Sequence, residues 1–308
     1  MPVLELDDWI ADVYQAVFMS SKDRFEELLA RAGALRAEGI RGRYAPSPTG
    51  TLHLGNVRTA LVAWLQVRLQ QGTLVMRMED IDLPRVIEGS AEEVLEDLRW
   101  VGLDWDEGPD VGGPLGPYDQ STRTELYEEA LRRLEEKGLI FRCYCSRKDV
   151  AEAASAPHGL GGVITYPGTC RTLTTEEEAA VRREKPDRDP AWRYRIPSRH
   201  VSLVDEVVGR YEENLETEVG DFVVRRADLI FAYQLAVVVD DALMGITDIV
   251  RGFDLLDSTP RQIDLFEALD FPVPRFWHIP LMLDETGQRL SKRDGSESLR
   301  MLRDQGLT

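Results

Sequence analysis

Two polar residues that could hold an anion, His53 and Asn56, lie where a loop passes into a predicted helix. The preceding loop, residues 43 to 52, is rich in proline, and the apolar-periodic run that follows predicts a helix that ends at Gly72. The N-terminus of a helix presents unpaired N–H groups and the positive end of the helix dipole. The pattern therefore predicts a site for nucleotide phosphates, although a plain strand–turn–helix connection would use the same prolines and glycines to shape its turn.

Two segments of the chain resemble the signature motifs of one enzyme family. Pro46-Ser47-Pro48-Thr49-Gly50 followed by His53-Leu54-Gly55-Asn56 resembles the HIGH signature of the class I aminoacyl-tRNA synthetases in its glutamyl form. Arg289-Leu290-Ser291-Lys292-Arg293 resembles the KMSKS loop of the same class, with arginine in place of the first lysine. The resemblance covers most of residues 41 to 300. It implies that His53, Asn56 and Lys292 are catalytic, and that ATP with Mg2+ binds at Pro46, Gly50, His53, Gly55, Asn56, Ser291 and Lys292.

Lys292 is the lysine that the expected reaction would use. When ATP activates an amino acid, a carboxylate oxygen attacks the α-phosphate, pyrophosphate leaves, and negative charge moves outward along the phosphates. No general base is needed, because alignment together with cations and N–H donors stabilises the moving charge. The alternative is that Lys292 is simply a solvated loop residue.

The same resemblance implies a glutamate pocket. Glutamate carries two carboxylates and one ammonium group, which calls for two arginines and one acid. Arg43, Arg251 and Glu79 have these charges at predicted strand ends, where ligands bind in open α/β sheets. Each arginine taken alone could instead form a structural ion pair. The full set that the resemblance implies is Arg43, Tyr44, Ala45, Pro46, Ser47, Glu79, Tyr233 and Arg251.

The three cysteines of the chain and one tyrosine form a predicted metal site. Cys143, Cys145, Tyr166 and Cys170 offer three thiolates and a phenolate for a tetrahedral ion, a set that favours zinc. Alternatively, Cys143 and Cys145 are small strand residues and Tyr166 packs as an aromatic residue. If the site does bind zinc, His158 competes with Tyr166 for the fourth position. Zinc-bearing glutamyl-tRNA synthetases end this site in Cys-x-His, where the present chain has Thr172. The Tyr-x-Gly-x-Cys-Arg form resembles the glutamyl-queuosine tRNA(Asp) synthetases instead.

The elements that position these residues alternate between strand and helix. A buried strand is predicted at residues 73–78 and another at 246–250, and such alternation favours a parallel sheet. The resemblance implies the α/β class I synthetase fold, a Rossmann-like parallel sheet split by a zinc-bearing α+β insertion. The predicted divisions are 1–40, an extension of unknown role; 41–120, the first half of the nucleotide-binding domain; 121–225, the acceptor-type insertion; 226–285, the second half; and 286–308, the KMSKS-like loop and a C-terminal helix.

Two helix starts carry recognisable capping signals. Ser90 with Glu93 predicts a capping box for a helix that runs to Trp100. Ser258 is predicted to cap a second helix, with Pro260 in its first turn.

The composition describes an acidic chain without a predicted membrane segment. Its 308 residues carry a formal net charge of -18, from 55 Asp and Glu against 37 Lys and Arg. No stretch is apolar enough to span a bilayer and no secretory signal is visible, so the cytoplasm is the expected compartment. The negative charge opposes RNA binding unless arginines gather on one face.

The resemblance implies that the chain activates L-glutamate with ATP and transfers it to queuosine in the anticodon loop of tRNA(Asp). The chain ends shortly after Lys292, which leaves no room for an anticodon-binding domain and favours the queuosine family. One alternative is a catalytic fragment of a glutamyl-tRNA synthetase that charges tRNA(Glu). Another is a non-catalytic binding module derived from a synthetase, which the intact motifs oppose. A monomer is the default expectation.

Overall fold

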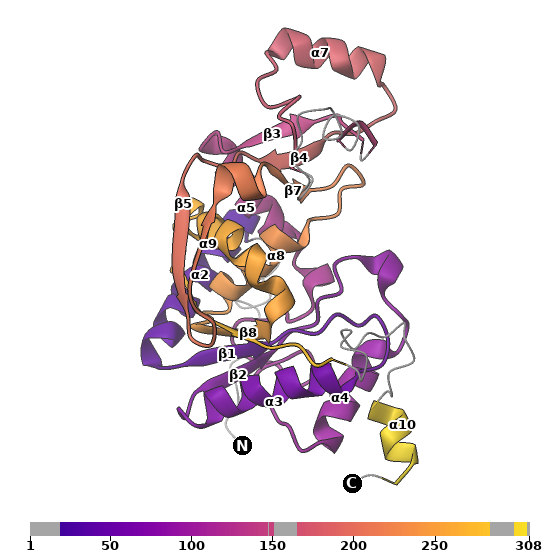
Figure 1. Cartoon of the computed structure of the whole chain (residues 1–308), viewed down its shortest axis with the longest axis vertical. Coiled ribbons are helices and arrows are strands. Elements are labelled where there is room, and N and C mark those ends of the chain that lie inside the picture. Colours follow the sequence, from indigo (N-terminus) through magenta and orange to yellow (C-terminus); the bar gives the residue numbers. More distant parts are fainter. Residues whose placement is uncertain (1–18, 147, 151–164, 284–298, 307–308) are drawn as a thin grey trace, which may run out of the picture.

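A parallel sheet lies at the centre of the larger part of the molecule (Figure 1). The computed structural model describes residues 19–146, 148–150, 165–283 and 299–306. The sheet has four strands in the order β2-β1-β8-β9, and each neighbouring pair is parallel. The predicted parallel sheet is therefore confirmed. Its strands are β1 (Arg41–Tyr44), β2 (Thr73–Met76), β8 (Asp248–Gly252) and β9 (Arg275–Ile279).

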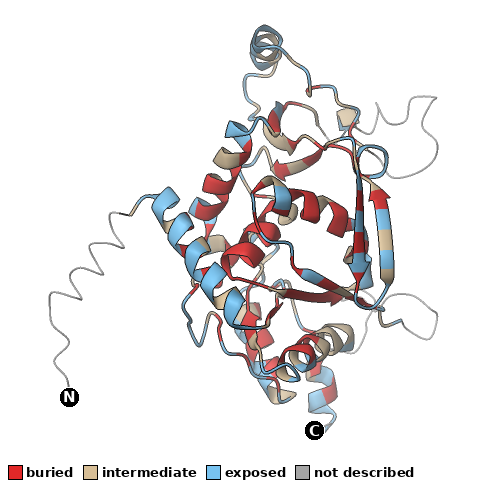
Figure 2. Ribbon diagram, turned by 90° about the vertical axis from the view of Figure 1, so that its left-hand side faces the viewer, coloured by how far each residue is buried: buried red, intermediate tan, exposed pale blue. Residues whose placement is uncertain are grey.

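Helices cover both faces of this sheet. On β2, Leu74 and Met76 belong to one hydrophobic cluster and Val75 to the other, because successive side chains of a strand point to opposite faces. The inward sides of the helices are accordingly buried, and their outer sides are exposed (Figure 2). The first cluster includes α3 (Leu54–Arg68) and α4 (Ser90–Trp100), and the second includes α2 (Ser21–Glu38), α5 (Thr124–Glu136), α8 (Tyr233–Leu243) and α9 (Thr259–Ala268).

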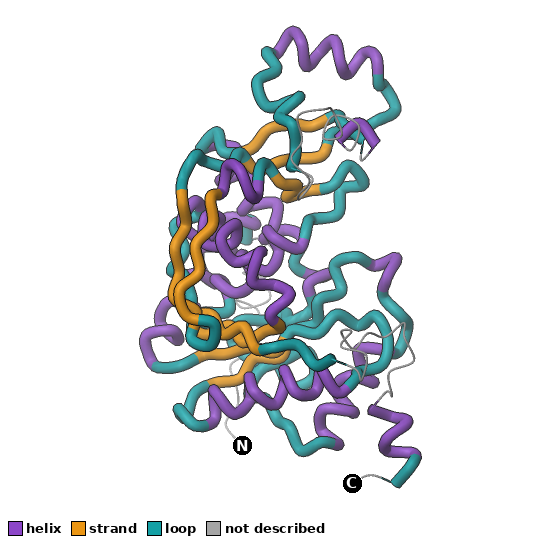
Figure 3. The backbone as a smooth tube through the Cα atoms, in the orientation of Figure 1, coloured by secondary structure: helices purple, strands orange, loops and turns teal. Residues whose placement is uncertain are grey.

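An antiparallel segment separates the two pairs of strands in the sequence. Its described residues form a three-stranded sheet in the order β3-β4-β7, a two-stranded hairpin β5-β6, and helices that include α7. In Figure 3 the hairpin extends from the antiparallel sheet along the helices to the edge of the parallel sheet. The elements are β3 (Ile140–Cys143), α7 (Thr175–Glu184), β4 (Ala191–Tyr194), β5 (His200–Asp205), β6 (Gly209–Asn214) and β7 (Phe222–Arg225), with a π-helical turn at Leu215–Val219.

The helix-capping predictions are only partly correct. Helix α4 spans the predicted residues, but Gly89 precedes it in the left-handed conformation, and the Ser90 hydroxyl bonds the backbone of Gly50 instead of capping the helix. The capping box is therefore wrong, since a tertiary partner has taken the hydroxyl. Helix α9 has Pro260 in its first turn as predicted, but the Ser258 hydroxyl accepts a hydrogen bond from Gln234 rather than from the helix backbone.

The last described helix, α10 (Leu299–Asp304), returns to the region of the first loop. The backbone N–H of Leu299 donates to the carbonyl of Leu52 at 2.9 Å, and Arg300 pairs with Glu93 of α4 at 2.9 Å. Short 3-10 turns occupy Leu83–Arg85, Gln120–Thr122 and Phe253–Ser258. None of the described helices is long and apolar enough to cross a membrane.

Candidate active site and cysteine cluster

A cleft of about 600 Å³ lies at the carboxyl ends of β1 and β8, beside the N-terminus of α3. Eleven of the residues predicted from the sequence line it together: Arg43, Tyr44, Ala45, Pro46, Ser47, His53, Gly55, Asn56, Glu79, Tyr233 and Arg251. Gly50 is not among the lining residues, and Ser291 and Lys292 lie outside the described residues. The described residues before and after Ser291 and Lys292 are near the cleft. Met282 lines it, and the backbone N–H of Leu299 donates to the carbonyl of Leu52.

His53 and Asn56 cap helix α3 reciprocally. The backbone N–H of Asn56 donates to Nδ1 of His53 at 3.3 Å, and the backbone N–H of His53 donates to Oδ1 of Asn56 at 3.1 Å. Because Nδ1 is an acceptor, the proton of a neutral ring is on Nε2. The remaining polar atoms of the pair, Nε2–H and the amide NH2, are both donors. This end of the helix therefore suits an anion.

Gly55 leaves the space that the His53 ring occupies. A Cβ atom at position 55 would lie 2.9 Å from Cε1 and 3.0 Å from Nδ1 of this ring. A side chain there would displace the imidazole, so the glycine of the HLGN motif is needed to seat its histidine.

Arg251 is a buried cation whose hydrogen-bond partners are neutral. Its Nη1 donates to Oε1 of Gln262 at 2.7 Å, its Nη2 to Oγ1 of Thr259 at 2.8 Å, and its Nε to Nε2 of His278 at 2.9 Å. Among the described residues no carboxylate oxygen lies within 4.0 Å of its guanidinium nitrogens. Burial, together with repulsion from Arg43, lowers the pKa of Arg251. This positive charge is therefore available to an anionic ligand.

Arg43 and Glu79 are held by a second network that centres on Asp241. Oδ1 of Asp241 accepts from Nε of Arg43 at 3.3 Å and from Nη1 of Arg77 at 2.7 Å. Arg77 in turn donates to Oε1 of Glu79 at 3.1 Å. Burial raises the pKa of Glu79, and the positive charges of Arg77 and Arg43 oppose this shift. The cleft thus combines two arginines with one acid, as glutamate requires.

The residues that hold these cleft side chains were not predicted. His278 lies in a buried strand and Asp241 closes the apolar run of α8, so each is a polar residue in an apolar pattern. That signal could have marked them as partners of buried cations, but it does not say which cation. Thr259 and Gln262 carry no such signal, because they follow a helix start where polar residues are common.

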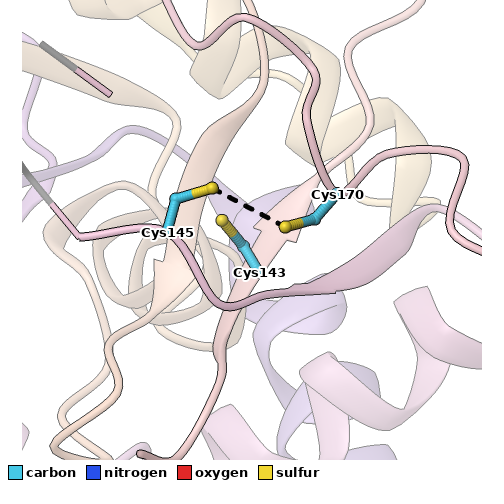
Figure 4. Close-up of side chains that lie close together, drawn as sticks. All are labelled: Cys143, Cys145 and Cys170. Atoms are coloured by element: carbon cyan, nitrogen blue, oxygen red, sulfur yellow. Dashed lines mark hydrogen bonds between the residues drawn. The ribbon is translucent and has the colours of Figure 1, made fainter. Parts of the chain in front are cut away.

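The three cysteine side chains point toward one another (Figure 4). Their sulfur atoms all lie within 4.8 Å of one another, and the Cys145–Cys170 separation is 3.7 Å. The Tyr166 hydroxyl oxygen lies 3.4 Å from the sulfur of Cys143 and 3.8 Å from that of Cys145. Around a tetrahedral zinc ion, sulfur atoms would be about 3.8 Å apart and a sulfur and an oxygen about 3.5 Å. The observed separations fit such an ion and are far too long for a disulfide.

Hydrogen bonds within the cluster divide its protons unequally. A hydrogen bond from Cys170, aided by one from Tyr166, lowers the pKa of the Cys143 thiol against the effect of burial. Burial raises the pKa of Tyr166, and the hydrogen bond to Cys143 raises the pKa of Cys170. The backbone N–H of Cys170 donates to the Tyr166 oxygen at 2.8 Å. The Arg193 guanidinium lies 4.0 Å from the centre of the Tyr166 ring. His158, the competing fourth ligand, lies outside the described residues.

The fold and the cleft belong to a known class of protein. Residues 39–307 match the family of class I tRNA synthetases (E and Q), catalytic domain. The chain belongs to this family and is a ligase of the class I aminoacyl-tRNA synthetase type. The predicted fold is therefore confirmed.

The chain can be placed more closely from its relatives. It is 54% identical over 268 residues to a glutamyl-Q tRNA(Asp) synthetase of Symbiobacterium thermophilum, a match that covers 86% of this chain and 81% of that protein. It is 44% identical to a glutamate–tRNA ligase of Sulfurihydrogenibium sp. (strain YO3AOP1), over 86% of this chain but 55% of that one. A solved glutamate-tRNA synthetase from Elizabethkingia anophelis matches with a TM-score of 0.75 and 33% identity, over 83% and 53% of the two chains. The chain thus spans about half the length of these glutamate–tRNA ligases, and it is a member of the glutamyl-Q tRNA(Asp) synthetases.

Proposed function

We propose that this chain activates L-glutamate with ATP and Mg2+, and transfers the glutamyl group to queuosine in the anticodon loop of tRNA(Asp). The observation that carries the activation step is the buried Arg251, whose charge no described carboxylate balances directly, in a cleft with Arg43 and Glu79. The choice of acceptor is supported by the similarity to a glutamyl-Q tRNA(Asp) synthetase over 81% of that protein's length.

In the activation step, Arg251 and Arg43 would bind the carboxylates of glutamate and Glu79 its ammonium group. The α-carboxylate oxygen then attacks the α-phosphate of ATP, the bond to the β-phosphate oxygen breaks, and pyrophosphate leaves. Nε2–H of His53, the amide of Asn56 and the N-terminus of α3 would stabilise the charge on the phosphates. Lys292 is proposed to neutralise the departing pyrophosphate, and Mg2+ to accompany the ATP phosphates.

In the transfer step, a hydroxyl of the queuosine cyclopentenediol would attack the carbonyl of glutamyl-adenylate, and AMP would leave. The unstacked bases of an RNA loop can enter such a cleft. We further propose that the protein is a cytoplasmic monomer and that its chain has the five divisions predicted from the sequence.

The proposed acceptor can be tested with labelled glutamate. We expect radiolabel on tRNA(Asp) that contains queuosine, because its diol supplies the attacking hydroxyl. No label is expected on tRNA(Asp) that lacks queuosine, and little on tRNA(Glu). Glutamyl-adenylate should form without any tRNA, as measured by exchange of pyrophosphate into ATP.

The two tRNA(Asp) forms are a matched pair, because they differ only in the modified base. Equal labelling of both, or efficient labelling of tRNA(Glu), would contradict the proposed acceptor. Either result would leave activation intact and support a glutamyl-tRNA synthetase fragment instead.

We also propose that Cys143, Cys145, Cys170 and Tyr166 bind one structural zinc ion. A zinc ion would crosslink β3 to the segment around residue 170 and so fix this end of the molecule. One zinc per chain is expected after dialysis, and a strong chelator should lower the thermal midpoint of unfolding. Folded protein that contains no metal after dialysis would rule out the site.

A conservative variant separates the tyrosine from the cysteines. Tyr166→Phe should weaken zinc binding by about tenfold or more, because it removes one ligand atom and keeps the ring. Full zinc retention in this variant would exclude only Tyr166 as the fourth ligand. Cys143→Ser is the comparison variant, because it removes one sulfur ligand.

A further inference from the structure

His278 is buried between Arg251 and a carboxylate from a different part of the fold. Its Nε2 lies 2.9 Å from Nε of Arg251, and its Nδ1 lies 2.6 Å from Oδ2 of Asp205. The side chains of His278 and Asp205 are both inaccessible to solvent. Arg251 can only donate, so Nε2 is the acceptor and the ring proton is on Nδ1, directed at the carboxylate. The tautomer of His278 is therefore fixed from both sides.

Asp205 is held in place by the hairpin in which it lies. It ends strand β5, and its Oδ1 accepts from the backbone N–H groups of Val207 and Val208 at 3.0 and 2.9 Å. The backbone N–H of Glu206 donates to the carbonyl of Phe276 at 2.9 Å, which joins the tip of the hairpin to β9. These hydrogen bonds fix the position of the carboxylate. Figure 3 shows the end of the hairpin beside the parallel sheet.

His278 separates the Asp205 carboxylate from Arg251, and this determines how far the carboxylate neutralises the guanidinium charge. Arg43 and Arg77 both contact a carboxylate directly, so Asp241 balances their charges. Arg251 is oriented by a neutral imidazole, and Asp205 is one residue further away. A carboxylate in direct contact would compete with an anionic ligand for the guanidinium. An imidazole acceptor orients Nε and leaves the positive charge for the ligand.

We propose that Asp205 and His278 are positioning residues for glutamate binding: Asp205 keeps the ring proton of His278 on Nδ1, and Nε2 then aims Arg251 at a substrate carboxylate without neutralising it. The inference rests on the proposed function, because it takes glutamate as the ligand. It extends the pocket to a residue of the β5-β6 hairpin, which does not line the cleft.

The first test is Asp205→Asn in the full chain. The amide oxygen can still close the hairpin turn, but the NH2 group facing Nδ1 would make that nitrogen an acceptor and place the ring proton on Nε2. Nε2–H and the Nε–H of Arg251 would then be two donors that face each other, and the Thr259 hydroxyl, 3.2 Å from Nε2, is an alternative acceptor for the ring proton. We expect the KM for glutamate in pyrophosphate exchange to rise by about tenfold to a hundredfold, whereas kcat and the KM for ATP should change by less than about threefold.

The second test reads the tautomer directly, without any substrate. The chain has 4 histidines, so selective nitrogen-15 labelling gives a simple spectrum, and His278→Gln identifies the signals of His278. In the parent protein Nδ1 should be protonated and Nε2 unprotonated, and Asp205→Asn should exchange these roles.

Two substitutions of the histidine separate the acceptor from the ring. His278→Phe keeps a ring beside Phe276 but has no acceptor, so glutamate KM should rise at least as much as in Asp205→Asn. His278→Gln supplies an amide oxygen near the position of Nε2 and should recover most of the affinity. Asp221→Asn is the matched control, since Asp221 is a buried carboxylate of the same segment that pairs with Arg171 and not with the cleft.

The possible results distinguish failure of the positioning role from failure of the proposed function. An exchanged tautomer in Asp205→Asn with unchanged glutamate KM would overturn the positioning role, and so would an equal rise in KM in Asp221→Asn. Absence of glutamate-dependent exchange in the parent protein would instead overturn the proposed function and the named ligand. The nitrogen spectrum would still report whether Asp205 sets the proton of His278.

Discussion

Replacing Arg251 by methionine is expected to raise the KM for glutamate by about a hundredfold or more, because the substrate carboxylate would lose its charged partner in a buried site. A loss of about 3 kcal/mol in binding corresponds to this factor. The thermal midpoint of unfolding should change little, since methionine has a similar length and removes a buried cation that only neutral groups contact. Pyrophosphate exchange at varied glutamate concentration, together with a thermal melt, measures both quantities.

Lys292→Ala is the contrasting variant for the same assay. Its charge should matter most as pyrophosphate departs, so kcat for exchange should fall far more than the KM for glutamate rises. An Arg251→Met protein with unchanged glutamate affinity would show that Arg251 is a structural residue. A Lys292→Ala protein with normal kcat would remove the lysine from the reaction.

The residues that line the cleft were predicted from a family resemblance, and several of them also follow two rules that are local in the chain. Ligands bind at the carboxyl ends of parallel strands, and Arg43, Glu79 and Arg251 end or follow such strands. The loop before α3 carries its own phosphate-binding pattern at His53 and Asn56. Each of these rules needs only a short window of sequence.

Partners that meet through the tertiary fold could not be predicted in the same way. Asp205 and His278 are 73 positions apart, in different sheets, and no local pattern joins them. The same limit explains the wrong capping box, because the Ser90 hydroxyl bonds to a residue 40 positions earlier. A serine before a helix predicts a cap only when no tertiary partner competes for it.

The pairing of charges also depends on the tertiary fold and not on a local pattern. The sequence shows an excess of acid, but it does not show that some of these acids are buried counterions of arginines. Asp240 and Asp241 are adjacent and both buried, yet they accept hydrogen bonds from different arginines: Asp240 from Arg123, and Asp241 from Arg43 and Arg77. Their different roles make them suitable for a paired experiment.

Asp241→Asn is expected to destabilise the protein strongly and to weaken glutamate binding as well. The substitution would remove the carboxylate that pairs with Arg43 and lies closest to Arg77, although Arg77 would keep Glu79 at 3.1 Å and Asp240 at 3.9 Å. Loss of one partner of a buried ion pair costs about 3 to 5 kcal/mol. For a chain of this size the thermal midpoint should fall by about 5 °C or more. Glutamate KM should rise by about tenfold, because Asp241 fixes Arg43 directly and Glu79 through Arg77.

Asp240→Asn distinguishes loss of stability from loss of the pocket. Asp240 accepts from Arg123 at 2.6 Å, from Gln120 at 2.7 Å and from Tyr127 at 2.9 Å, and its side chain is as deeply buried as that of Asp241. Its loss should lower the thermal midpoint by a similar amount but leave glutamate KM within about threefold. Asp240 lies 3.9 Å from Nε of Arg77, and Arg43, Arg77 and Glu79 keep their hydrogen bonds without it. Both variants should be assayed well below their melting temperatures. An equal rise in KM in the two proteins would mean that general loosening of the core weakens binding, whereas a rise confined to Asp241→Asn would show that this carboxylate aligns the charges that bind glutamate.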